Sequence, residues 1–335
     1  MTGTVSIKEL AQACGISVSA ASKAMNNKKG ISPEKAELVR EKAKELGYCP
    51  NAVARAMRTK RSYNIGVLFN NGFDHEFFSM VLEAIHGRAE ELGYDICFFS
   101  NRIHSDYGYY AHAMNRQCDG IIIAQGDFVG EQVEEMLSGE LPVVSIEKSY
   151  PGHSAVLTDN MESMREIVRY LYSAGHRRIA FVCGEMGEVT ARRIEGFKAG
   201  CRELGLDADD GYIYRARFQN PKASGIATRE LLKLSEPPTC ILYPDDVSAL
   251  GGMTELASQG LRVPEDVSCF GYDGIRLASL LRPRLTTYSQ NAREMGRQAV
   301  EKLISEIENP GIAPETVIVR GEIVPGDTVY IHNNV

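Results

Sequence analysis

Residues 6–27, SIKELAQACGISVSAASKAMNN, decide the fold of the first part of the chain. Ser6 and Glu9 have the spacing of a capping box, in which the two side chains accept from each other's backbone N–H groups. Apolar residues then recur at helical spacing until Gly15 interrupts them, and Ser17 can cap a second helix. Two short helices that meet at a glycine predict a helix-turn-helix unit, although a helical corner without a nucleic-acid partner has the same pattern.

A third helix is expected from Ser32 to Leu46, because the triplet Ser-Pro-Glu at 32–34 supplies an N-cap, a proline at the first helical position and an acid in the first turn. Residues 1–62 hold 12 Lys and Arg and five Glu, a net charge of +7, whereas the whole chain carries −7. A basic module on an acidic body predicts a polyanion-binding head, and a solvated basic face without a partner is the alternative.

In a helix-turn-helix unit the second helix enters the major groove of DNA, where its first side chains reach base edges. An ammonium group can donate to guanine, a hydroxyl can serve a base or a phosphate, and an apolar side chain can contact a thymine methyl. The candidates for base contacts are Val18, Ser19 and Lys23. The candidates for contacts with the DNA backbone are Ser6, Ser17, Ser22, Asn26 and Arg58.

The segment after the head, residues 50–62, is expected to form a hinge helix and a linker. Asn51 can cap a helix of about seven residues, which is marginal alone in water and is expected to fold against a second copy on DNA. Met57 can insert between base steps from the minor groove. The minor-groove candidates are Asn51, Ala54, Arg55 and Met57, and a plain linker is the alternative reading of this segment.

The composition excludes several classes of protein. A chain of 335 residues with 44% hydrophobic and 24% charged residues is typical of a soluble globular protein with about two domains. No apolar run reaches the roughly 18 residues of a membrane helix and no signal peptide is evident, so we expect a cytoplasmic protein without a membrane partner. The cysteines form no C-x-x-C pair and the histidines are dispersed, so we assign no metal and no cofactor.

Beyond residue 62, apolar strand-like runs alternate with amphipathic helices in two series. The strands are expected at 65–69, 96–99, 120–124 and 143–146, and then at 179–182, 240–242 and 267–271. Repeated β-α units predict parallel sheets with helices on both faces, and two series predict two lobes with a ligand between them. The expected fold is therefore α/β: a three-helix head followed by a core of two doubly wound parallel-sheet lobes.

Polar and aromatic residues near strand ends are the candidates for binding that ligand. Asp245, Asp273 and Glu147 follow strands, and Arg193 is expected to open a helix after a loop. Carboxylates and a guanidinium can form paired hydrogen bonds with vicinal hydroxyls, and a phenyl ring can cover an apolar ring face, which suits a sugar or a nucleoside-like ligand. Asp246 is interpreted as the N-cap of the following helix. The full candidate set is Phe78, Glu147, Arg193, Phe218, Asp245 and Asp273.

Several blocks resemble, in the same order, the lactose-repressor (LacI/GalR) family of transcription regulators. They are residues 5–27 and 31–69, GHRRIAFVCG at 175–184, PPTCILYPDDVSALGGMTELASQGLRVPEDVSCFGYDG at 237–274 and LRPRLTTYSQNAREMGRQAVEKLI at 281–304. The resemblance implies a DNA-binding repressor with a head at 1–49, a hinge at 50–62 and a core at 63–335 that is similar to periplasmic sugar-binding proteins. Lobe 1 would hold about 63–160 and 290–320, and lobe 2 about 161–289 and 321–335.

The resemblance also implies a homodimer on a near-palindromic double-stranded DNA operator, controlled by a small-molecule effector, for which we expect a carbohydrate. The six candidates for ligand binding match family positions that contact the effector. Lys23, Met57 and Glu147 differ from the residues usual in the family, and a shorter loop leaves open whether Arg192 or Arg193 is the matching arginine. The alternatives are a cytoplasmic solute-binding protein without DNA readout and a sugar hydrolase that uses Asp245 and Asp273 as a carboxylate pair.

Overall fold

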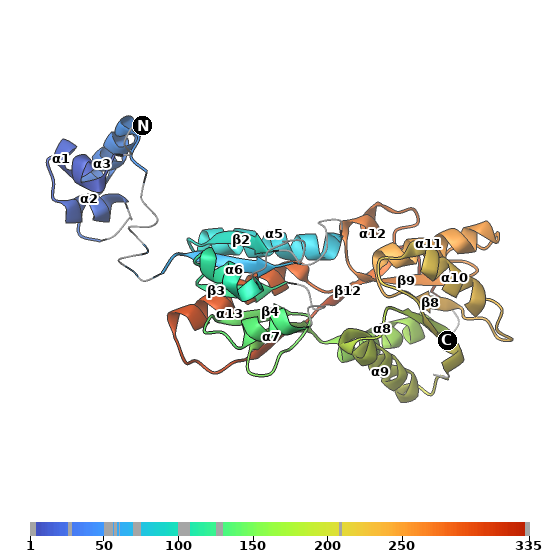
Figure 1. The fold of residues 1–335 in the computed structure, drawn as a ribbon. Helices are drawn as coiled ribbons and strands as arrows, with labels where there is room; N and C mark the ends of the chain where they lie inside the picture. The colour runs from blue at the N-terminus through green and yellow to red at the C-terminus, as the bar shows by residue number, and fades with distance from the viewer. Residues whose placement is uncertain are drawn as a thin grey trace. The chain divides into compact units, whose positions relative to one another are not determined.

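The computed structural model of the chain describes residues 5–25, 29–49, 56, 59, 61–69, 75–99, 108–124, 130–207 and 210–331. By internal contacts the chain divides into two units, Met1–Tyr63 and Asn64–Val335. Figure 1 shows the first unit as a small group of helices and the second as a core of two lobes.

The described residues of the head form the predicted helix-turn-helix unit with a third helix. The helices are α1 (Ile7–Ala13), α2 (Val18–Met25) and α3 (Pro33–Leu46). Ser6 and Ser32 cap the first and third helices, and Gly47 ends the third in the left-handed conformation that glycine adopts easily. Their apolar faces enclose a small core of Leu10, Ala24, Ala36, Val39 and Ala43.

Lobe 1 is built on a sheet whose described strands have the order β11-β5-β4-β3-β1-β2, with every pair parallel. Its central strands are almost wholly buried, which explains their continuous Ile and Val runs. The strands are β1 (Asn64–Leu68), β2 (Asp95–Phe99), β3 (Gly120–Ile123), β4 (Val143–Ile146), β5 (Ser154–Thr158) and β11 (Thr316–Val319). The helices are α5 (Glu76–Glu91), α6 (Tyr109–Asn115), α7 (Glu131–Leu137) and α13 (Ala292–Glu308).

Lobe 2 repeats this plan with the strand order β12-β10-β9-β8-β6-β7 in the described residues. All pairs are parallel except β10 with β12. The strands are β6 (Ile179–Cys183), β7 (Ile213–Arg215), β8 (Cys240–Leu242), β9 (Ser268–Asp273), β10 (Thr286–Ser289) and β12 (Glu322–Val324). The helices are α8 (Asn160–Ser173), α9 (Glu188–Glu203), η1 (Asp210–Tyr212), α10 (Pro221–Leu231), α11 (Asp246–Ser258) and α12 (Arg276–Leu280).

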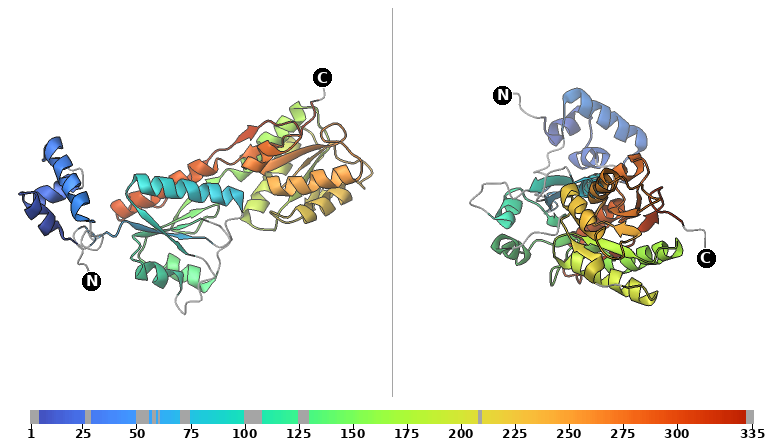
Figure 2. Two further views of the ribbon diagram at one scale, coloured as in Figure 1. Left: turned by 90° about the horizontal axis from the view of Figure 1, so that it is seen from above. Right: turned by 90° about the vertical axis from the view of Figure 1, so that its right-hand side faces the viewer.

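The helices cover both faces of the sheets, as the β-α pattern predicts. In lobe 1, α5 and α13 lie side by side on one face, and α6 and α7 lie on the other (Figure 2). A glycine permits the close approach of α5 and α13, because a Cβ at Gly296 would lie 2.5 Å from the carbonyl oxygen of Val81. In lobe 2, α8 packs against α9 and α10 packs against α11. The α/β architecture with two parallel-sheet lobes is thus confirmed.

Within the described residues the chain passes between the lobes three times, after β5, after β10 and after β11. The segments that follow β1, β2 and β3, residues 70–74, 100–107 and 125–129, lie outside the described residues. The described residues at the lobe boundary therefore come mainly from lobe 2, from the crossing segments and from the end of β4. No helix in the described part of the chain is long and apolar enough to cross a lipid bilayer.

Candidate functional site

The outer face of α2 carries the residues predicted to contact bases. Val18 is 43% exposed, and Ser19 and Lys23 are exposed as well. The opposite face, with Ala21 and Ala24, is fully buried in the head. The helix therefore presents one face to solvent while the other holds it in the three-helix unit.

The serines predicted to contact phosphates have different surroundings. The N and Oγ of Ser6 both donate to Oε2 of Glu9, at 2.7 and 2.9 Å, so the capping box engages this hydroxyl. These bonds hold the pKa of the Glu9 carboxyl below its ordinary value. Oγ of Ser17 accepts from the N of Ala20 at 3.1 Å, and Ser22 is half-buried. Their contacts with DNA stay predictions.

The side chain of Lys23 lies close to Gly30. A Cβ at Gly30 would lie 3.2 Å from Nζ of Lys23, and the φ of Gly30 is +103°, which disfavours a side chain there. The remaining predicted DNA contacts lie outside the described residues: Asn26, Asn51, Ala54, Arg55, Met57 and Arg58.

Arg193 is the centre of a buried polar cluster at the lobe boundary, and it is 3% exposed. The prediction that Arg193 opens a helix was wrong, because α9 already begins at Glu188, an acid that favours the first turn. Its Nε donates to Oδ1 of Asn160 at 2.8 Å, and its Nη1 donates to the carbonyl of Pro244 at 3.0 Å. Its guanidinium carbon lies 3.6 Å from the ring centroid of Tyr272.

Gln290 joins Arg193 to Asp273. Its Oε1 accepts from Nη2 of Arg193 at 3.4 Å and from Oγ1 of Thr158 at 3.0 Å, and its Nε2 donates to Oδ1 of Asp273 at 2.5 Å. Asp273 is 5% exposed, and its φ is +105°. Burial, with two neighbouring carboxyls, raises the pKa of Asp273 well above its ordinary value, and the nearby guanidinium of Arg193 acts in the opposite direction.

Glu147 extends the cluster into lobe 1. It follows β4, and its Oε1 accepts from the N of Thr158 at 3.0 Å. The Oγ1 of Thr158 lies 2.8 Å from the same oxygen, and its single proton is shared between Glu147 and Gln290. A continuous chain of hydrogen bonds thus runs from Glu147 through Thr158 and Gln290 to Asp273. This chain joins the two lobes through two of the crossing segments.

Asp245, rather than Asp246, is the N-cap of α11, so the interpretation of Asp246 as the cap was wrong. The helix begins one residue earlier than predicted, because Asp245 has the extended conformation of a cap and its Oδ1 accepts from the N of Ser248 at 2.7 Å. Its Oδ2 accepts from the N of Gln219 at 2.8 Å. Both carboxylate oxygens of Asp245 therefore accept hydrogen bonds from the backbone. This arrangement does not favour a sugar hydrolase in which Asp245 and Asp273 act as the catalytic pair of carboxylates.

Asp246 is fully buried within the first turn of the helix. Its Oδ2 accepts from the N of Ile275 at 2.9 Å, and its Oδ1 accepts from Oγ1 of Thr287 at 2.5 Å. Burial raises the pKa of Asp246 to about 7, against the effect of these hydrogen bonds.

The two predicted phenylalanines have different positions. The ring centroid of Phe218 lies 5.9 Å from the guanidinium carbon of Arg193, and its ring fills the space where a Cβ at Gly184 would stand. Phe78 lies in the first turn of α5 and packs edge-on against His75 and Phe77. The described contacts thus join Phe218 to the cluster, together with Arg193, Asp273 and Glu147.

Four further residues belong to this cluster and were not predicted from the sequence: Thr158, Asn160, Tyr272 and Gln290. Thr158 ends β5 and Gln290 follows β10, two strands that were not predicted. The rule that selected Asp273, a polar residue at a strand end, would have selected both if these short strands had been recognised.

A pocket of about 230 Å³ adjoins the cluster at the lobe boundary. Its lining includes Glu147, Thr158, Asp159, Asn160, Glu188 and Arg192. Arg192 is exposed, and its Nη1 lies 3.9 Å from the sulfur of Met161. The two successive arginines therefore have different positions: Arg193 is buried in the cluster, and Arg192 lines the pocket.

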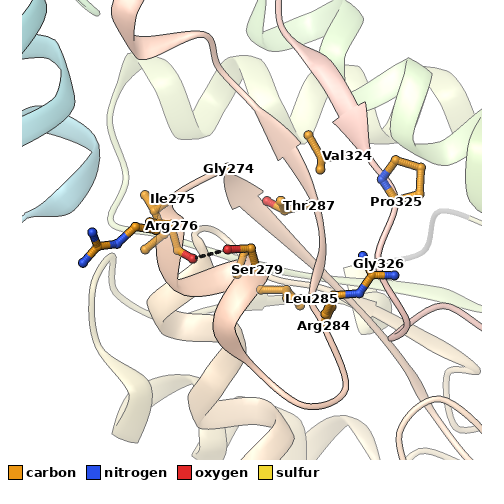
Figure 3. A pocket seen from close by; sticks show the side chains of 11 residues that line it. Gly274, Ile275, Arg276, Ser279, Arg284, Leu285, Thr287, Val324, Pro325 and Gly326 are labelled. Atoms are coloured by element: carbon orange, nitrogen blue, oxygen red, sulfur yellow. Dashed lines mark hydrogen bonds between the residues drawn. The ribbon is translucent and has the colours of Figure 1, made fainter.

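A second pocket, of about 200 Å³, lies in lobe 2 between α12, β10 and β12 (Figure 3). Ile275, Leu285 and Val324 supply apolar walls, and the guanidinium of Arg276 points away from the other labelled side chains. None of the six predicted ligand-binding residues lines it. Among the described residues, no group of three or more His, Cys, Asp or Glu side chains is placed to hold a metal ion.

Both parts of the chain match known families. Residues 6–51 match the bacterial regulatory proteins of the lacI family, and residues 168–329 match the periplasmic binding protein-like domain. Catabolite control protein A of Priestia megaterium is 30% identical over 322 residues, which cover 94% of this chain and 96% of that protein. The transcriptional repressor PurR of Vibrio atlanticus is 29% identical over 334 residues, which cover 98% and 99%.

Solved structures show the same architecture. A lac repressor dimer bound to operator and an anti-inducer has a TM-score of 0.77 at 23% identity, over 98% of this chain and 100% of that one, which shows the shared fold. A LacI family regulator from Enterococcus faecium with bound ribose has a TM-score of 0.70 at 26% identity, over 81% and 100%. PurR, the lac repressor and the Enterococcus faecium protein are named as repressors or transcriptional regulators, and none of the four proteins is named as an enzyme. With its helix-turn-helix head and its two-lobed core, the chain belongs to the lacI family of bacterial regulatory proteins.

Proposed function

We propose that this regulator represses transcription by placing α2 in the major groove of an operator, under the control of an uncharged small metabolite held between the core lobes. The observation that carries the proposal is the buried cluster around Arg193, which lies at the lobe boundary and is hydrogen-bonded to both lobes. A ligand that contacts this cluster acts directly on the segments that connect the lobes.

The residue roles follow from the positions described above. Val18, Ser19 and Lys23 contact bases, because they occupy the solvent face of α2. Arg193, Asp273, Glu147 and Phe218 bind the effector, whereas Asp245 shapes the site as a helix cap. Phe78 completes the site from lobe 1. The hinge residues after Pro50 bind the minor groove in the operator complex.

The effector is a carbohydrate in this proposal. Carboxylates and a guanidinium next to an aromatic ring suit a hydroxylated ring with an apolar face. Two relatives of the same fold were solved with cellobiose and with ribose. The protein acts in the cytoplasm as a homodimer, in which each head reads one half of a near-palindromic site, as the operator-bound dimer of the lac repressor suggests.

Selection of random DNA duplexes by the full chain tests DNA recognition. The expected product is one enriched near-palindrome whose binding weakens steeply as salt rises, because phosphate contacts release counterions. Repeating the selection step with single sugars and nucleosides identifies the effector as the compound that changes retention of this duplex. Binding without sequence preference, or the absence of any salt-sensitive binding, contradicts the proposal.

A further inference from the structure

Lys23 occupies a different part of α2 from the other two side chains that we propose to contact bases. Val18 and Ser19 begin the helix, whereas Lys23 lies in its last turn, shortly before the residues that connect α2 to α3. The surroundings of the Lys23 side chain therefore depend on this connecting segment as well as on α2 itself.

The outer part of the Lys23 side chain runs along Gly30. A Cβ at Gly30 would lie 3.8 and 3.9 Å from Cδ and Cε of Lys23, which is ordinary van der Waals contact, but only 3.2 Å from its Nζ. At that distance either the ammonium group or the backbone of residue 30 would have to move. Because glycine has no Cβ, the ammonium can occupy its present place.

The backbone of Gly30 is a second reason for glycine at this position, and it is independent of Lys23. The φ of Gly30 is +103°, a value that glycine adopts readily and other residues adopt rarely. A side chain at residue 30 would therefore act in two ways, through backbone strain and through contact with Lys23. An experiment on this position has to separate the two effects.

The path of the side chain matters because an ammonium group is a compact charge on a flexible stem, without the fixed fork of a guanidinium. The base edge that it reaches is therefore decided by where the stem is held. Lys23 makes no hydrogen bond or ion pair in the part of the chain that the structure describes. A stem that already packs against Gly30 in the free protein also loses less rotamer freedom on binding.

We propose, on the basis of the function proposed for α2, that Gly30 is a positioning residue for DNA recognition. Because Gly30 has no side chain, Lys23 lies along it, and this path determines which base pair the ammonium reads. A side chain at residue 30 displaces the ammonium and reduces the base preference at that pair. The other pairs are read as before, because the three heavy atoms nearest to a Cβ at Gly30 all belong to Lys23.

Gly30→Ala in the full-length protein tests this role, on the operator recovered by selection and on its single-base variants. Fluorescence anisotropy gives the discrimination at each base pair, that is, the ratio of affinities for the preferred base and for the others. We expect Gly30→Ala to reduce discrimination at least about fivefold at one pair, the lower end of what one contact between a side chain and a base contributes. Lys23→Ala should reduce discrimination at the same pair.

Gly47→Ala is the matched control for backbone strain. Gly47 ends α3 with a φ of +65°, and the described residues leave the position of a Cβ there open. A general effect of alanine at a positive φ, such as a less stable head, should weaken binding of all duplexes alike in both variants. If circular dichroism shows that Gly30→Ala does not fold, Gly30→Asn adds the Cβ with a residue that is found more often at positive φ.

The double variant Lys23→Ala/Gly30→Ala shows whether the two residues act through one contact. Its discrimination should equal that of Lys23→Ala alone, because the alanine at residue 30 then has no ammonium to displace. Equal losses at every base pair in Gly30→Ala, or additive losses of discrimination in the double variant, would overturn the inference and leave the proposed function intact. A wild type that enriches no duplex would contradict both.

Discussion

The solvent face of α2 and the cluster around Arg193 differ in how far their functional side chains are exposed to solvent. Lys23 and Ser19 are exposed on a short helix, whereas Arg193, Asp273 and Gln290 are each at most 5% exposed and bound to one another. The difference follows from the partner of each site. A helix that reads DNA needs side chains free to reach base edges, while a small-molecule site needs groups held in position before the ligand arrives.

The largest expected effect of a substitution is that of Arg193→Ala. It leaves three buried oxygen acceptors, on Asn160, Pro244 and Gln290, without the guanidinium that donates to them, so the free energy of unfolding should fall by about 3–5 kcal/mol. The response to the effector should disappear, and operator binding should remain. Denaturant unfolding and operator titration measure both effects. Arg192→Ala, at the neighbouring exposed position, should change stability by less than about 0.5 kcal/mol, and similar losses in the two variants would refute a special role of Arg193.

Asp246 should make the stability of lobe 2 depend on pH. Its pKa is about 7 in the folded protein and ordinarily 3.8, so the folded state holds a proton that the unfolded state has lost. The stability that this group contributes is therefore complete below about pH 4 and is lost as pH rises to about 7, at up to about 1.4 kcal/mol per pH unit.

Asp246→Asn removes this contribution, since asparagine does not titrate. The difference in unfolding free energy between variant and wild type should move in favour of the variant between pH 4 and pH 8. Urea unfolding at several pH values gives that difference directly. A difference that stays constant with pH would show that Asp246 keeps an ordinary pKa.

A smaller effect is expected on α2, where the side chains contact a partner rather than one another. Lys23→Ala should weaken operator binding on the order of ten- to hundredfold and relax base preference at one position, without changing the unfolding of the core. Fluorescence anisotropy on the selected operator and on its single-base variants measures both effects. Lys35→Ala, an exposed change on α3, is the matched control, and an equal loss on random DNA would argue against base reading by Lys23.

Elements with a continuous apolar run or with clear caps were predictable from the sequence, and strands with polar residues at their ends were not. The helices of the head follow from apolar periodicity and caps, and strands such as β1, β3 and β6 follow from continuous apolar runs. β5, β7, β10, β11 and β12 were missed, because polar residues interrupt or shorten their apolar runs and they take their structure from pairing with a neighbour.

The candidate site shows the same limit. Arg193 and Asp273 were found, but Thr158 and Gln290 were not, because they belong to strand ends that only the tertiary pairing defines. The cap was assigned to Asp246 instead of Asp245, since either of two successive aspartates can begin a helix. Which one does so depends here on bonds from Gln219, Ile275 and Thr287, which are distant in sequence.

The most direct test measures the coupling between operator binding and effector binding, once through each ligand. Operator affinity is determined with and without saturating effector, and effector affinity is determined with and without operator DNA, in the same buffer and salt. We expect the two ratios to be equal, as linkage requires, and to differ clearly from one in the wild type. Both ratios should fall to one in Arg193→Ala. An operator affinity that is unchanged by a ligand bound between the lobes would contradict this expectation.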